Sequence, residues 1–103
     1  MISVADLAQA LLESDPFVRA DAVADVVSDI AACEVLGIAL RDEFPLVRRE
    51  AVRTLGRIGG TEATKALSDS AAHDPSAEVR EEAVAVLARM LTSGRRERGS
   101  IGG

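Results

Sequence analysis

Three arginines in the middle of the sequence have the spacing of one helix face. Arg49, Arg53 and Arg57 recur every four residues, so a helix would align them in a row. The planar guanidinium group forms paired hydrogen bonds with carboxylates and phosphates. Such a row could therefore clamp an acidic or phosphorylated partner.

The alternative is that these arginines pair within the molecule. Arg49 could contact Glu82 or Asp21, and the other two could contact Asp25 or solvent. Exposed pairs of this kind contribute only about 0 to 1 kcal/mol each. If a partner binds here, the candidate contact residues are the basic row and its charged neighbours: Arg49, Arg53, Arg57, Asp21, Asp25, Glu82 and Arg89.

Asp21, Asp25 and Asp29 also recur every four residues and raise the question of a metal site. Helical rise would place the outer two carboxylates about 12 Å apart, which is too far for one ion. The sequence therefore predicts no metal ion at this position.

The remaining reactive residue types stand alone. His73 is the single histidine and Cys33 the single cysteine, and neither has a partner group at catalytic spacing. We expect an exposed turn histidine, a small half-buried cysteine, and neither a cofactor nor an enzymatic activity. Gly37 interrupts an apolar stretch, where it would allow close helix packing.

The elements that must position these residues follow from a repeated phrase. The sequence reads VRADAV at 18–23, VRREAV at 47–52 and VREEAV at 79–84, with intervals of 29 and 32 residues. A period of this size is typical of stacked structural units. In each copy the apolar residues recur at helical spacing, and a shorter helical pattern precedes it.

These patterns predict an all-α fold, an α-solenoid of three helical hairpins. The six helices are expected at about 3–13, 16–31, 33–41, 45–58, 61–73 and 76–92. The units span about 3–31, 33–59 and 61–92 in one domain of residues 1–93. Residues 94–103, GRRERGSIGG, have no apolar period and predict a disordered basic tail.

The valine and the alanine-valine pair of each phrase are expected to point inward, and the arginine outward or sideways. An acidic turn residue precedes each arginine, in the pairs Asp15 and Arg19, Asp42 and Arg48, and Asp74 and Arg80. Repeated down a stack, these groups could satisfy turn N–H groups and link one unit to the next.

The stretches DEFPLVRREAVRTLGRIGG and DPSAEVREEAVAVLARM resemble HEAT repeats, in particular the short HEAT-like kind first associated with bilin lyases. The resemblance covers about residues 3–93. It implies that the second helices line a concave face and that a protein partner binds there, as in a scaffold. It also suggests an alternative, an accessory subunit of a bilin lyase-like or other modifying enzyme.

Charge and composition indicate which classes of partner the chain can bind. The net charge is −5, and residues 1–93 carry −7, which argues against a nucleic-acid partner. One cysteine and the lack of a long apolar run favour a cytoplasmic protein that contacts no membrane. Val86 is expected on the outward side of the last helix, where with Met90 and Leu91 it could form a homodimer through the last repeat.

Overall fold

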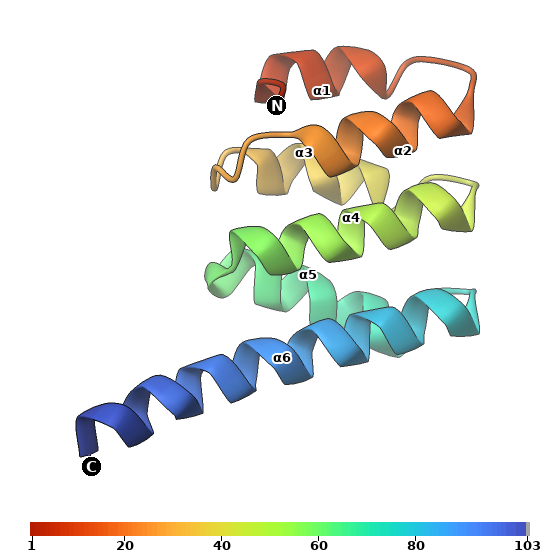
Figure 1. Cartoon of the computed structure of the whole chain (residues 1–103). Coiled ribbons are helices and arrows are strands. Elements are labelled where there is room, and N and C mark those ends of the chain that lie inside the picture. Colours follow the sequence, from red (N-terminus) through yellow and green to blue (C-terminus); the bar gives the residue numbers. More distant parts are fainter. Residues whose placement is uncertain (103) are drawn as a thin grey trace.

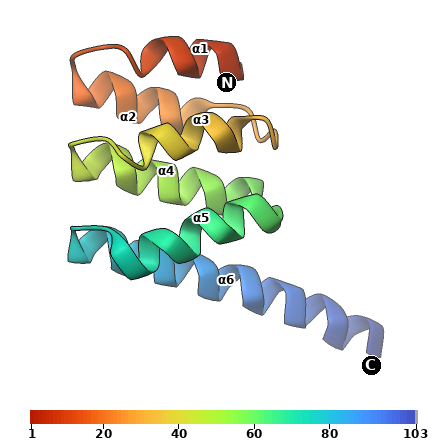
Figure 2. The same cartoon turned by 180° about the vertical axis from the view of Figure 1, so that it is seen from behind.

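The chain forms two layers of helices in the computed structural model, which describes the backbone of residues 1–102 and the side chains of residues 1–93. Its helices are α1 (Val4–Ala10), α2 (Pro16–Asp25), α3 (Ala32–Ala39), α4 (Pro45–Ile58), α5 (Gly60–His73) and α6 (Ala77–Gly102). One layer holds α2, α4 and α6 side by side, and the other holds α1, α3 and α5 (Figures 1 and 2). The predicted all-α stack of three hairpins is confirmed.

The helices of the second-helix layer, α2, α4 and α6, begin as the turn residues dictate. Asp15 accepts a hydrogen bond from the N–H of Phe17 at 2.8 Å, and Pro16 occupies the first turn of α2. Pro45 likewise lies in the first turn of α4, whose N-cap residue Phe44 makes no side-chain capping bond. The three turns within the hairpins lie along one edge of the molecule, at the right of Figure 1.

The end of α2 differs from the prediction, because α2 stops at Asp25 and not near residue 31. Val26 is extended and forms a parallel bridge with Ile2: Ile2 N–H donates to the Asp25 carbonyl at 2.8 Å, and Val27 N–H donates to the Ile2 carbonyl at 2.9 Å. Two β-branched residues favour this extended backbone. As a result, Ile30 lies exposed in the following turn.

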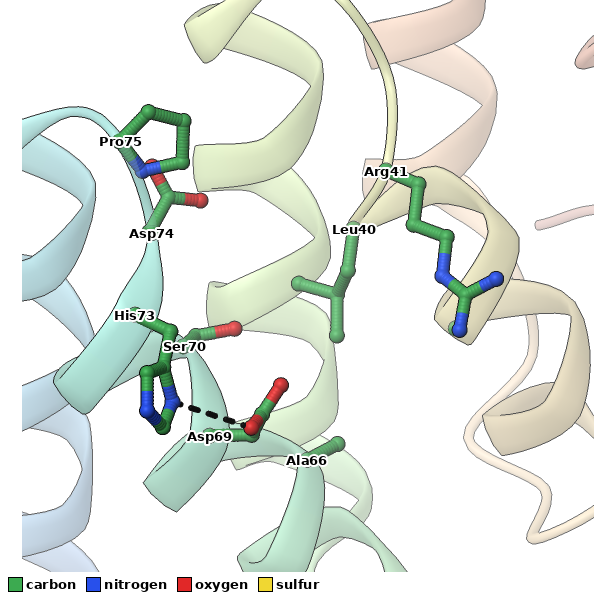
Figure 3. A pocket seen from close by; sticks show the side chains of 9 residues that line it. Leu40, Arg41, Ala66, Asp69, Ser70, His73, Asp74 and Pro75 are labelled. Atoms are coloured by element: carbon green, nitrogen blue, oxygen red, sulfur yellow. Dashed lines mark ion pairs between the residues drawn. The ribbon is translucent and has the colours of Figure 1, made fainter.

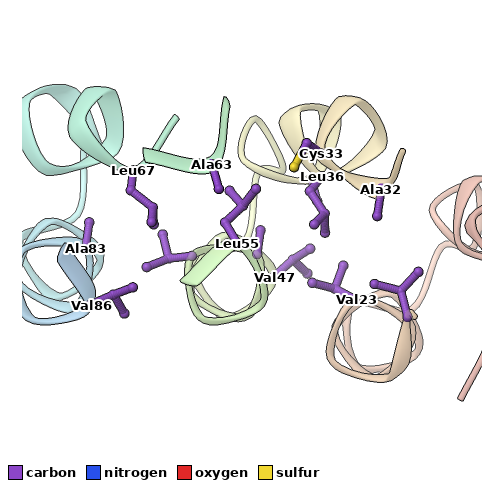
Figure 4. Close-up of a cluster of buried hydrophobic side chains, with 14 of the residues drawn as sticks. Val23, Ala32, Cys33, Leu36, Val47, Leu55, Ala63, Leu67, Ala83 and Val86 are labelled. Atoms are coloured by element: carbon purple, nitrogen blue, oxygen red, sulfur yellow. The ribbon is translucent and has the colours of Figure 1, made fainter. Parts of the chain in front are cut away.

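Small and branched side chains fill the space between the two layers (Figure 4). The buried alanines and valines of the repeated phrases keep neighbouring helices close. Leucines from the layer of α1, α3 and α5 complete the core. The largest fully buried side chains are Leu7, Val23, Val26, Leu36, Val47, Val52, Leu55, Leu67 and Val79.

Four packing predictions are wrong. Val86 is buried, whereas Val18 and Val84, expected inside, are exposed. A Cβ built on Gly56 would overlap Cγ1 of Val86, so the absence of a side chain at Gly56 lets α4 and α6 pack closely here. Gly37 has nothing within 4 Å of such a Cβ, so it does not serve close packing.

The backbone of α6 continues to Gly102. The side chains of residues 94–103 lie outside the described part of the chain. The disordered tail therefore stays a prediction.

Candidate functional site

The turn edge carries a ladder of buried ion pairs between units. Arg19 donates to Asp42 of the next hairpin with Nε at 2.8 Å and Nη2 at 3.1 Å. Arg48 repeats this with Asp74, at 3.0 and 3.3 Å. Each arginine thus contacts the acid of the following unit, as the prediction of linked units requires. The carboxylates of Asp15, Asp42 and Asp74 also accept turn N–H groups, as predicted.

Backbone groups complete the ladder. The Nη1 groups of Arg19, Arg48 and Arg80 each donate at 2.7 Å to a carbonyl six residues earlier, those of Glu13, Asp42 and Asp74. By this measure the Glu13 carbonyl takes the place of the Asp42 and Asp74 carbonyls. The carboxylate of Asp15, however, accepts the N–H two residues later as those of Asp42 and Asp74 do, so the first unit is two residues shorter between its turn aspartate and its arginine.

The carboxylate of Asp42 is held ionised by its surroundings. Burial disfavours the charged form, but hydrogen bonds from Arg19 and from the N–H of Phe44 outweigh burial and lower the pKa of Asp42. The ring of Phe44 lies 5.6 Å from the Arg19 guanidinium carbon and covers it. The ladder is therefore a structural element and not an open binding site.

The predicted basic row lies on the opposite face of α4 from the core. Arg49 pairs with Glu78 of α6. Arg53 contacts Glu50 at 3.1 Å and Glu82 at 3.4 Å. The row is thus paired within the stack, although Arg49 does not contact Glu82 or Asp21 as the alternative interpretation proposed.

Arg57 has a structural task that its sequence position did not reveal. Its Nη2 donates to the carbonyls of Ala24 at 3.3 Å and Val26 at 3.0 Å, and its Nη1 donates to Ser28. These carbonyls lie where α2 ends early, so Arg57 satisfies the open end of α2. It does not contact Asp25, whose carboxylate lies 3.3 Å from the amino terminus of Met1.

Three of the predicted residues nevertheless meet in one pocket between α4 and α6. Its volume is about 280 Å³, and it is lined by Arg53, Gly56, Arg57, Val86, Arg89, Met90 and Ser93. Arg89 is largely exposed, with its guanidinium 3.9 Å from Glu82. We call this site the arginine pocket. No carboxylate lines it, and its apolar floor exists because Gly56 has no side chain.

The other predicted site residues do not line the arginine pocket. Asp21 is exposed on α2, Arg49 lies one turn before Arg53, and Glu82 pairs with Arg53 and Arg89 beside the pocket. Asp29 accepts a hydrogen bond from Ala31 N–H at 2.9 Å in the turn after α2. Among the described residues, no three His, Cys, Asp or Glu side chains gather as a metal ion would require.

A second pocket, of about 310 Å³, lies between α3 and α5 (Figure 3). His73 Nδ1 lies 3.2 Å from Asp69 Oδ1 one turn earlier on the same helix, and both side chains are exposed. Leu40 and Arg41 line the opposite wall. A solvated pair on one helix is typical of a surface and gives no reactive constellation.

Cys33 is buried on α3. Burial, and then the nearby carboxylate of Glu62, raise the pKa of its thiol. A reactive cysteine needs the opposite shift. Cys33 therefore behaves as a small core residue.

The geometry of stacked hairpins with a repeated arginine-aspartate link agrees with a comparison against protein families. HEAT repeats match residues 4–88. The chain belongs to the HEAT repeat family. Members of this family generally mediate protein–protein interactions. No match was found among the curated proteins. Within the described residues, no helix is both long and apolar enough to cross a membrane.

Proposed function

We propose that this HEAT repeat protein is a noncatalytic binding module that holds an acidic segment of another protein on the face formed by α2, α4 and α6. The observation that carries the proposal is the arginine pocket, where Arg53, Arg57 and Arg89 surround an apolar floor. A carboxylate or phosphate would meet several N–H donors there, and an adjacent apolar side chain would cover Val86 and Met90.

The charges around the pocket support this class of partner. Arg57 is fixed by its contacts with the end of α2, so it is a preorganised donor. Arg89 is largely exposed and pairs with Glu82 at 3.9 Å, a long contact that a ligand carboxylate could replace. Glu50 and Glu82 offset part of the positive charge, which favours a partner that offers one or two acidic groups over a long polyanion such as nucleic acid.

The alternative of an accessory subunit for a bilin lyase-like enzyme draws no support from the described site. A thiol-linked chromophore would need an accessible thiolate, and Cys33 is buried with a raised pKa. Protein binding remains the function that the arginine pocket favours.

A peptide-display selection tests the proposal. Random peptides selected on the immobilised protein should be enriched in Asp or Glu next to an apolar residue. The double variant Arg53→Ala/Arg89→Ala should lose this enrichment while keeping its helicity, because both side chains are exposed. Arg41→Ala removes an exposed arginine from the other layer and is the matched control. Equal enrichment with the double variant would place the binding site elsewhere.

A further inference from the structure

The outer edge of α6 carries an apolar stripe that the described residues leave uncovered. Small and apolar side chains recur there at helical spacing next to one arginine, around a shallow groove of about 350 Å³. We call this surface the α6 edge; its residues are Ala77, Arg80, Glu81, Val84, Ala85 and Leu91.

The internal repeats show what such an edge accepts. Val84 aligns with Val23 of α2 and Val52 of α4 in the repeated phrase. Val23 and Val52 are both 0% exposed, because the next unit covers them, whereas Val84 is 56% exposed. The α6 edge thus has the character of a unit-to-unit surface, and no unit among residues 1–93 covers it.

Arg80 also lacks, within residues 1–93, the carboxylate partner that the other two ladder arginines have. Its Nη1 donates to the Asp74 carbonyl, as Arg48 does to Asp42. In Arg19 and Arg48, Nε and Nη2 bind the carboxylate of the following unit. Within the described residues 1–93, the Nε and Nη2 groups of Arg80 have no carboxylate acceptor.

The opposite edge of the stack, formed by α1 and α2, has the complementary features. Val18 is 42% exposed, although its equivalents Val47 and Val79 are 0% exposed beneath the preceding unit. The Glu13 carbonyl takes the ladder position of the Asp42 and Asp74 carbonyls, and the Glu13 side chain is exposed beside that of Asp15. We call this surface the α2 edge; its exposed acidic residues are Glu13, Asp15, Asp21 and Asp25.

We propose that the α6 edge of one copy docks on the α2 edge of a second copy of this chain, so that the stack continues from molecule to molecule. Arg80 binds the Glu13 carboxylate of the next copy, and Val84 covers Val18. This contact is independent of the arginine pocket, and it repeats the geometry that already joins α2 to α4 and α4 to α6.

Charge decides between this arrangement and a symmetric pair of α6 edges. If two α6 edges packed against each other, Arg80 would face Glu81 of the other copy and no acidic residue in a turn. The α2 edge supplies the exposed carboxylates of Glu13, Asp15 and Asp21, and a fourth, Asp25, that pairs with the amino terminus of Met1. A head-to-tail contact does not close on itself, so short linear assemblies should grow with concentration.

Sedimentation velocity on the full chain tests the inference. From about 5 µM to about 1 mM, the range of weak and transient complexes, the average mass should rise beyond a dimer. Val84→Glu and Val18→Glu each destroy one edge at an exposed position, so each variant alone should be a folded monomer. Their equimolar mixture should form a dimer of defined mass, because each variant retains the edge that the other lacks.

Matched controls make each result decisive. Ile38→Glu places the same charge on an exposed apolar residue of α3 and should leave association unchanged. Glu13→Arg should weaken self-association about tenfold or more through repulsion with Arg80. The inference is overturned if the wild-type chain stays monomeric over the whole range, or if the mixture of the two valine variants stays monomeric. Continued association of Val18→Glu alone would also overturn it, because it would indicate symmetric pairing.

Discussion

Arg48 and Arg49 are neighbours in the sequence, yet they belong to different regions of the molecule. The Arg48 side chain is 8% exposed and donates to both oxygens of Asp74, which is 3% exposed. Arg49 is 31% exposed and pairs with Glu78, which is largely solvated. The same chemical group is therefore a structural link on the turn edge and an adjustable surface charge on the second-helix face.

The three repeats differ in the same way at the Arg48 and Arg49 positions. The Arg48 position holds an arginine in all three units, Arg19, Arg48 and Arg80. The Arg49 position holds Ala20 in the first unit and Glu81 in the third. Burial requires the ladder partner at every unit interface, whereas the Arg49 position varies in both residue type and exposure, since Ala20 is buried, Arg49 is half-buried and Glu81 is exposed.

The largest expected effect comes from breaking the ladder. Arg48→Ala leaves Asp74 as a buried carboxylate without its cation, which should lower the free energy of unfolding by about 3 to 5 kcal/mol. Arg49→Ala removes an exposed pair and should cost at most about 1 kcal/mol. Denaturant unfolding of both variants measures the difference. Similar losses for the two neighbours would refute the division into a structural and an adjustable region.

The floor of the arginine pocket provides the next test, because it depends on helix approach and not on charge. Gly56→Ala should lower the free energy of unfolding by about 1 to 3 kcal/mol, since the new methyl group overlaps Val86 in the core. Gly37→Ala on α3 meets open space and should stabilise the helix by about 0.5 to 1 kcal/mol. Thermal unfolding compares the two, and a stabilising Gly56→Ala would contradict the observed packing.

Within the basic row, Arg57 should contribute more to stability than its neighbours do, as a ladder arginine does. Arg57→Ala frees the carbonyls of Ala24 and Val26 and should cost about 1 to 2 kcal/mol, as expected for hydrogen bonds from a charged donor. Arg53→Ala should cost less than about 1 kcal/mol. If the two variants lose equal stability, the contacts of Arg57 with the end of α2 contribute nothing.

The sequence was sufficient to predict the stack and the ladder because both repeat. The VR and AV positions recur three times at helical spacing, and each turn acid stands before its arginine. The spacing of the repeats does not show whether a turn carboxylate contacts the arginine of its own unit or that of the preceding unit. That depends on how far one hairpin is displaced along the next, and in the structure Arg19 contacts Asp42 of the following unit.

The arginine pocket could be predicted only in part. Spacing on one helix placed Arg53 and Arg57 together, and alignment of the units placed Arg89 beside them. Gly56 was missed, and Met90 and Val86 were assigned to a dimer surface, because the distance between α4 and α6 decides whether they form the floor of a pocket. The early end of α2 was missed because its cause, the bridge from Ile2 to Val26, comes from a distant segment.

The smallest expected effect is a loss of stability at acidic pH. It should depend on the ladder carboxylate of Asp42 and not on an exposed surface carboxylate. The folded chain lowers the pKa of Asp42, so the ionised carboxylate stabilises the fold above its ordinary pKa, and this contribution is lost as the pH falls below about 4. Wild-type stability should therefore fall more steeply than that of Asp42→Asn between neutral pH and about pH 2. Asp21→Asn removes an exposed carboxylate outside the ladder and should follow the wild-type curve. Parallel curves for wild type and Asp42→Asn would mean that the contact with Arg19 does not favour the ionised carboxylate.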